Sequence, residues 1–173
     1  MEKDGIPYTG FLYAGLMIDA KGHPKTLEFN CRMGDPETQP IMMRVKSDLL
    51  DALEHAVDGT LDQADITWDR RTALGVVLAA HNYPDTPRNG DVIAPLPAET
   101  EDCAVFHAGT RMENGQLKTS GGRVLCVTAL GDSVRMARER AYAAVNGVQF
   151  DGRQYRTDIG WRALKPSQQK AKP

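Results

Sequence analysis

The feature that most constrains the fold is a segment near the amino terminus in which apolar and polar residues alternate. Residues 26–32 read Thr-Leu-Glu-Phe-Asn-Cys-Arg. Successive side chains of a β-strand point to opposite faces, so this pattern predicts a strand with one polar and one apolar face. The polar face comprises Glu28, Asn30 and Arg32. The apolar face comprises Leu27, Phe29 and Cys31.

The polar face of this strand presents a carboxylate, an amide oxygen and a guanidinium in a row. Such oxygens suit a hard divalent cation such as Mg²⁺, whose remaining ligands are usually substrate phosphates and water. The planar fork of Arg32 matches phosphate or carboxylate oxygens. Two alternatives stay open: the face is the solvated side of an edge strand, or Arg32 forms a structural ion pair with Asp35 or Glu37. The residues around the strand must decide between them.

Composition places the chain among ordinary globular proteins. It has 173 residues, enough for one domain or two small ones, with 41% hydrophobic and 25% charged residues. A formal net charge of -2 gives no electrostatic reason to expect nucleic acid or an anionic membrane as a partner. No stretch approaches the ~20 apolar residues of a membrane span and no signal-peptide pattern is present, so we expect a cytoplasmic protein. Cys31, Cys103 and Cys126 lack metal-type spacing and lie in apolar, strand-like contexts, which predicts buried free thiols.

The first third of the chain is expected to form a β-hairpin followed by helices. The predicted elements are strands 11–19 and 25–32, a loop over 33–40 and a short helical segment over 41–46. A second helix is predicted from the capping residue Asp48 to about Val57, with Gly59 as the stop. Its apolar positions at helical spacing are Leu49, Leu50, Leu53 and Val57.

The remainder of the chain reads as an α+β unit. The predicted strands are 72–80, 103–109 and 124–129, with loop-rich sequence over 83–97 and a tight turn at Asn114-Gly115. A helix is predicted from the cap Ser133 to about Asn146. A short closing segment over 155–162 precedes a polar tail that we expect to be disordered.

Two stretches of the chain resemble a known enzyme family. They are Tyr8-Thr9-Gly10-Phe11-Leu12-Tyr13-Ala14-Gly15-Leu16-Met17 and Glu28-Phe29-Asn30-Cys31-Arg32-Met33-Gly34-Asp35-Pro36-Glu37-Thr38-Gln39. Both are similar to the carboxyl-terminal part of the glycinamide ribonucleotide synthetases, or phosphoribosylamine–glycine ligases, which are ATP-grasp enzymes. The likeness continues through residues 74–80, 90–93, 105–110, 121–129 and 158–163, so it runs from about Tyr8 to about Leu164.

The resemblance implies an α/β (α+β) fold, in which the carboxyl-terminal part of an ATP-grasp domain precedes a small α+β carboxyl-terminal domain. We expect residues 1–66 to belong to the first domain, 67–164 to the second and 165–173 to a disordered tail. The family enzymes are longer, and no Gly-rich phosphate loop occurs here. We therefore expect a fragment that lacks the amino-terminal part of the enzyme: a cloned region, a truncated gene product or one piece of a larger protein.

The resemblance also implies the reaction. The family joins glycine to 5-phosphoribosylamine with ATP as co-substrate, giving glycinamide ribonucleotide, ADP and phosphate through glycyl phosphate, in purine biosynthesis. Carried onto this chain, Glu28 and Asn30 become ligands of Mg²⁺ (or Mn²⁺) and Arg32 becomes the catalytic contact to the transferring phosphoryl group. We expect the chain alone to be inactive. The rival interpretations are another ATP-grasp carboxylate–amine ligase and a non-catalytic interaction module.

A further set of residues is expected to bind substrate. These are Gly34, Asp35, Gly121, Gly122 and Arg123. A glycine pair lets the backbone approach a ligand closely, and its N–H groups together with an arginine can meet a substrate phosphate. The alternatives are that Asp35-Pro36 only starts a turn and that residues 121–123 are an ordinary turn into a strand. His107 is expected to be a structural histidine.

Overall fold

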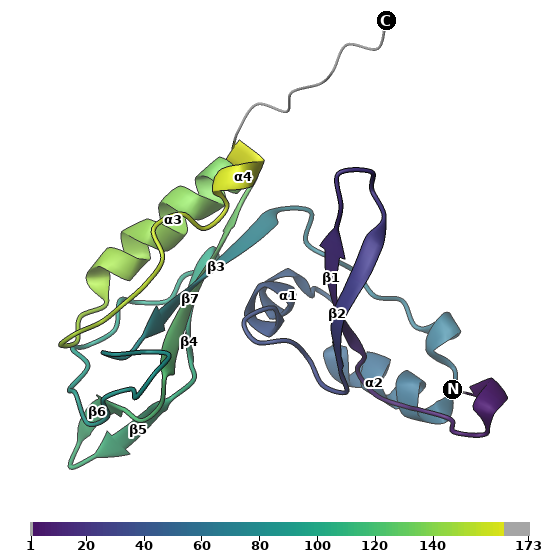
Figure 1. Ribbon diagram of the computed structural model, residues 1–173, viewed down its shortest axis with the longest axis horizontal. Coiled ribbons are helices and arrows are strands. Elements are labelled where there is room, and N and C mark those ends of the chain that lie inside the picture. Colours follow the sequence, from purple (N-terminus) through teal and green to yellow (C-terminus); the bar gives the residue numbers. More distant parts are fainter. Residues whose placement is uncertain (1, 165–173) are drawn as a thin grey trace, which may run out of the picture. The chain divides into compact units, whose positions relative to one another are not determined.

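The computed structural model describes residues 2–164, and the tail at 165–173 that we expect to be disordered lies outside the described residues. Contacts group the chain into two compact units: Met1–Thr38 with Val45–Asp69, and Gln39–Arg44 with Arg70–Pro173. Both contain helices and strands, and every strand pair is antiparallel, which confirms the predicted mixed α/β class (Figure 1). Within residues 2–164 no helix is long and apolar enough to cross a membrane.

The first unit is built around the predicted hairpin. Strand β1 (Tyr13–Ile18) pairs with β2 (Pro24–Asn30), with an irregularity in the register between Gly15 and Leu16. The turn is held by the carboxylate of Asp19, which accepts hydrogen bonds from the backbone N–H groups of Lys21 at 2.8 Å and His23 at 3.0 Å. These backbone donors favour the charged form and lower the pKa of Asp19.

The apolar face of the hairpin is not covered. Leu27 and Phe29 are 65% and 63% exposed, and the thiol-bearing residue Cys31 is exposed as well. The prediction of a buried thiol is therefore wrong for Cys31, because β2 ends before it and, within residues 2–164, no further layer packs on the apolar face of this two-stranded sheet. It is confirmed for Cys126, which is buried in the second unit.

The helix predicted after Asp48 is present as α2 (Leu49–Asp58). The Asp48 carboxylate accepts a hydrogen bond from the N–H of Leu50 at 2.8 Å, and Gly59 ends the helix with φ 72°. Two of its apolar residues, Leu50 and Val57, are exposed rather than packed inward. The unit also holds two 3-10 turns, η1 (Glu2–Asp4) and η2 (Leu61–Gln63).

A three-stranded sheet forms the centre of the second unit. Its strands are β3 (Thr72–Ala79), β7 (Arg123–Gly131) and β4 (Cys103–His107), in the order β3-β7-β4. A separate hairpin of β5 (Thr110–Glu113) and β6 (Gln116–Thr119) turns at Asn114-Gly115, where both residues have positive φ. All three predicted strands and the predicted turn are confirmed.

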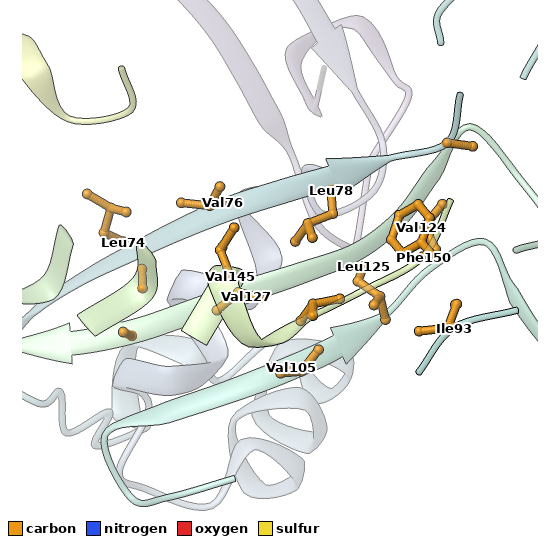
Figure 2. Close-up of a cluster of buried hydrophobic side chains, with 14 of the residues drawn as sticks. Leu74, Val76, Leu78, Ile93, Val105, Val124, Leu125, Val127, Val145 and Phe150 are labelled. Atoms are coloured by element: carbon orange, nitrogen blue, oxygen red, sulfur yellow. The ribbon is translucent and has the colours of Figure 1, made fainter. Parts of the chain in front are cut away.

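One face of this sheet is covered by α3 (Val134–Gly147). Ser133 caps the helix by accepting a hydrogen bond from the N–H of Met136 at 3.2 Å, as the sequence predicts. Figure 2 shows the resulting core, in which side chains of β3, β7, β4 and α3 gather with Ile93 and Phe150. Burying one Val or Leu side chain contributes about 1.5–3 kcal/mol, so this unit has the apolar interior that the exposed hairpin lacks. The short helix α4 (Trp161–Leu164) follows the closing segment.

A residue from the first third of the chain, Pro40, lies close to Gly75 of β3. Helix α1 (Thr38–Arg44) starts earlier than predicted, because Pro40 falls in its first turn, where the missing N–H carries no penalty. A Cβ added at Gly75 would lie 3.4 Å from Pro40 Cγ, beside Cys126 and Thr128. The absence of a side chain at Gly75 therefore leaves room for the Pro40 ring.

Candidate functional site

The polar end of the hairpin brings the two expected metal ligands together. Glu28 and Asn30 lie on one face of β2, opposite Gly15 and Tyr13 of β1 respectively. A Cβ at Gly15 would approach Glu28 Cγ to 3.1 Å, so the glycine leaves the space that the Glu28 side chain uses. Glu28 is exposed and Asn30 is half-buried.

The donor set of this face fits Mg²⁺ or Mn²⁺. A carboxylate and an amide oxygen are hard ligands, and two protein ligands are enough where phosphates and water complete the octahedron. Among the described residues no group of three or more His, Cys, Asp or Glu side chains is placed to hold a metal ion. Glu28 and Asn30 would supply two of the oxygen ligands of such an ion.

Tyr13 and Glu37 lie beside this face, and the sequence analysis did not predict that they belong to the site. The hydroxyl of Tyr13 donates a hydrogen bond to Glu37 Oε1 at 3.3 Å. The charge of Glu37 disfavours the phenolate and raises the pKa of Tyr13. A Cβ at Gly34, which is buried, would overlap the Glu37 carboxylate, so the glycine is what lets this carboxylate lie against the backbone.

Arg32 follows the strand rather than belonging to it. Strand β2 ends at Asn30, two residues before the predicted end, and Arg32 Nη1 donates to the carbonyl of Met33 at 2.8 Å. Beyond it, the N–H of Thr38 bonds to the carbonyl of Gly34 at 3.1 Å, and the Asp35-Pro36 peptide bond is cis. The loop from Arg32 to Thr38 is thus a folded turn into α1.

The remaining substrate-binding candidates lie in the second unit, where β7 begins. Gly109 and Gly121 meet backbone to backbone: a Cβ at Gly109 would lie 2.7 Å from the Cα of Gly121. The N–H of Gly109 bonds to the carbonyl of Arg123 at 2.8 Å, and the N–H of Ser120 bonds to the carbonyl of Gly109 at 2.7 Å. These contacts make the turn before β7 a tightly packed platform.

Tyr83 joins this platform, and the sequence reasoning gave it no role. Its hydroxyl accepts a hydrogen bond from Arg123 Nε at 3.1 Å. His107 Nδ1, at the end of β4, is hydrogen-bonded to Thr110 Oγ1 at 2.9 Å. The partnership of Tyr83 and Arg123 joins residues forty positions apart, so no local signal in the sequence marks it.

Comparison with known proteins assigns both units to one family. The family model described as "Phosphoribosylglycinamide synthetase, C domain" matches residues 73–162, and that described as "Phosphoribosylglycinamide synthetase, ATP-grasp (A) domain" matches residues 1–38. The fold and the motif thus define a protein of the ATP-grasp class. More specifically, the chain belongs to the phosphoribosylglycinamide synthetase family.

The similar proteins are named phosphoribosylamine–glycine ligases. The chain is 70% identical over 165 residues to the phosphoribosylamine–glycine ligase of Ralstonia nicotianae and 56% identical over 170 residues to that of Xanthomonas axonopodis pv. citri. It covers 39% of the length of each, while 95% and 98% of this chain is matched. The solved ligase from Thermotoga maritima superimposes with a TM-score of 0.80 at 40% identity, over 91% of this chain and 39% of that one.

A more distant solved structure shares the fold. The biotin carboxylase domain of the 2-oxoglutarate carboxylase from Hydrogenobacter thermophilus has a TM-score of 0.58 at 14% identity, over 82% of this chain and 32% of that one.

Proposed function

We propose that this chain contributes the metal-binding strand and the carboxyl-terminal domain of a phosphoribosylamine–glycine ligase. That enzyme would use ATP to join glycine to 5-phosphoribosylamine, giving glycinamide ribonucleotide, ADP and phosphate in the cytoplasm. The observation that carries the proposal is that Glu28 and Asn30 lie on one face of β2, within a stretch matched by the family's ATP-grasp model. The 70% identity to a relative of that name supports it.

The first half of the reaction is a phosphoryl transfer. A carboxylate oxygen of glycine attacks the γ-phosphorus of ATP, the bond to the bridging oxygen breaks, and ADP leaves with that electron pair. Glu28 and Asn30 would hold Mg²⁺, with Mn²⁺ as a substitute, and the ion supplies positive charge to the phosphate oxygens. Arg32 would bind the equatorial oxygens of the transferring group, where charge is spread in the transition state.

The second half is an acyl transfer. The amine of phosphoribosylamine attacks the carbonyl carbon of glycyl phosphate, the C–O bond to phosphate breaks, and the amine loses a proton. Gly34 and Asp35 would shape the pocket for glycine or the ribosylamine, and Gly121, Gly122 and Arg123 would meet the substrate phosphate. In this proposal residues 1–66 are the end of the ATP-grasp domain and 67–164 the carboxyl-terminal domain. The remaining ATP-binding groups would belong to the part of the ligase that corresponds to the region of the relatives not covered by this chain.

A single substitution in the longer ligase that carries these residues tests the metal assignment. Glu28→Ala is expected to lower turnover by several orders of magnitude while the thermal unfolding temperature stays near that of the parent, since Glu28 is exposed. Lys25→Ala, which changes another exposed charge on the same strand, is the matched control and should leave turnover unchanged. Near-normal activity of Glu28→Ala at saturating Mg²⁺ would reject the assignment.

The products identify the acceptor and separate this proposal from its rivals. Glycine-dependent release of ADP together with formation of glycinamide ribonucleotide is the expected result. Release of ADP with a different carboxylate or amine would instead point to another ATP-grasp ligase. No nucleotide turnover by the longer protein under any of these conditions would point to a non-catalytic module.

A further inference from the structure

Tyr83 is fixed in place by its own backbone and by its neighbours. Its N–H is hydrogen-bonded to the carbonyl of Ala80 at 3.2 Å and to Gln154 Oε1 at 3.1 Å. The loop that follows is pinned by Arg88, whose guanidinium reaches Asp91 at 2.9 Å and Asp151 at 2.6 Å. The phenol ring therefore projects from an anchored segment.

The ring of Tyr83 lies against the glycine pair that precedes β7. A Cβ at Gly122 would approach ring atom Cδ2 to 2.6 Å and Pro87 Cγ to 3.2 Å. Only a residue without a side chain permits this contact. The carbonyl of Gly122 also accepts a hydrogen bond from the N–H of Ala80 at 2.9 Å. Gly122 is therefore held both by the backbone of Ala80 and by its contact with the Tyr83 ring.

The hydroxyl at the end of this ring meets Arg123. Arg123 Nε donates to the hydroxyl oxygen at 3.1 Å, while the arginine as a whole remains exposed. A guanidinium held through Nε keeps its plane in one orientation, which reduces the rotamer freedom lost when it binds a ligand. Tyr83 thus prepares the orientation of a cation at the surface.

The same turn presents backbone donors. Among residues 2–164 no carbonyl oxygen accepts a hydrogen bond from the N–H groups of Gly121 and Gly122, both of which are half-buried. Successive backbone N–H groups together with a guanidinium fork are a recognised arrangement for phosphate oxygens. The chemistry selects an anion with several oxygens over a neutral ligand.

We infer that Tyr83 is a positioning residue that orients Arg123 to bind a phosphate monoester, namely the 5-phosphate of the ribosyl substrate. This inference rests on the proposed function for the identity of the substrate. Removing the hydroxyl leaves the ring on Gly122 but releases Arg123 Nε, so recognition of the phosphate should weaken while the fold persists.

The test uses the 173-residue chain and the Nε–Hε NMR signals of its arginines. The signal missing from Arg123→Lys identifies Arg123. Ribose 5-phosphate should shift this signal, and Tyr83→Phe should move it in the free protein and weaken ribose 5-phosphate binding about fivefold, the value of one ordinary hydrogen bond. Tyr155→Phe, which truncates another half-buried tyrosine of the unit, is the matched control and should do neither.

Three other ligands distinguish the sources of phosphate. Ribose without phosphate should not bind, and inorganic phosphate and ADP should bind more weakly than ribose 5-phosphate. Equal binding of inorganic phosphate or ADP would overturn the assignment to the ribosyl substrate. An unmoved Arg123 signal on addition of ribose 5-phosphate, or unchanged affinity in Tyr83→Phe, would overturn the positioning role.

Kinetics of the longer ligase provide an independent measurement. Tyr83→Phe should raise the KM for phosphoribosylamine and leave kcat and the KM for ATP unchanged, since the contact is made equally in the ground and transition states. A fall in kcat alone would contradict the inference. Normal activity of Glu28→Ala would overturn the metal assignment yet leave the ribose 5-phosphate titration intact, so the two failures are separable.

Discussion

The contact between Tyr83 and Gly122 makes Gly122→Ala an informative perturbation. The added methyl would lie 2.6 Å from Tyr83 Cδ2 and 2.9 Å from Cε2, well inside ordinary carbon contact. Either the ring moves and gives up the hydrogen bond to Arg123, worth about 1 kcal/mol, or the backbone absorbs an overpacking cost of about 1–3 kcal/mol. Both routes predict a loss of about 1–3 kcal/mol in the free energy of unfolding.

The assay is urea unfolding of the whole chain followed by tryptophan fluorescence and circular dichroism. Gly147→Ala is the matched control, because a Cβ there would meet Pro97 at an ordinary 3.7 Å and the residue ends a helix. This control should be neutral or stabilising by up to about 1 kcal/mol. The slope of the unfolding free energy with urea should stay the same in both variants.

A double-mutant cycle identifies the source of the loss. In a Tyr83→Ala background the added methyl at Gly122 has no ring to meet, so most of the penalty should vanish. A full penalty in that background would assign the clash to Pro87 instead and refute the reasoning. The same urea midpoint of unfolding for Gly122→Ala and Gly147→Ala would also refute the predicted clash between the added methyl and Tyr83.

Three further outcomes are expected. In the longer ligase, Arg32→Lys should lower kcat more than it raises the KM for ATP, because lysine keeps the charge but loses the fork; a pure KM effect would assign Arg32 to ground-state binding. The 173-residue chain should unfold cooperatively yet show no glycine-dependent ADP release, since it spans 39% of the length of its ligase relatives; measurable turnover would contradict this. At neutral pH a thiol reagent should modify exposed Cys31 first and Cys103 more slowly, because burial raises the pKa of the Cys103 thiol and leaves less thiolate; equal rates would be inconsistent with the structure.

Local patterns in the sequence account for most of the elements. The hairpin, α2 with its Asp48 cap and the strands of the second unit follow from alternation, capping residues and apolar runs. Each of these signals depends on residues a few positions apart. That is why their boundaries agree with the structure to within a few residues.

Contacts between distant residues were not predictable in the same way. The partnership of Tyr13 with Glu37 depends on the hairpin register and on Gly34, and that of Tyr83 with Arg123 depends on sheet topology. Cys31 illustrates the reverse case, because its apolar context suggests burial although the structure leaves this residue exposed. Periodicity identifies a face but not what, if anything, covers it.

The placement of residues 39–44 has a consequence for how this sequence can change. The chain crosses from one unit to the other three times, between residues 38 and 39, 44 and 45, and 69 and 70. Cleavage of a single peptide bond therefore cannot separate the two units as intact fragments. Gln39 directly follows the loop that carries Gly34 and Glu37, and Pro40 fills the space beside Gly75. An insertion or deletion between Gly34 and Gln39 would therefore shift both the loop and the position of Pro40 beside Gly75. Mutations that adjust the length of this stretch can be tolerated only when both ends are accommodated together.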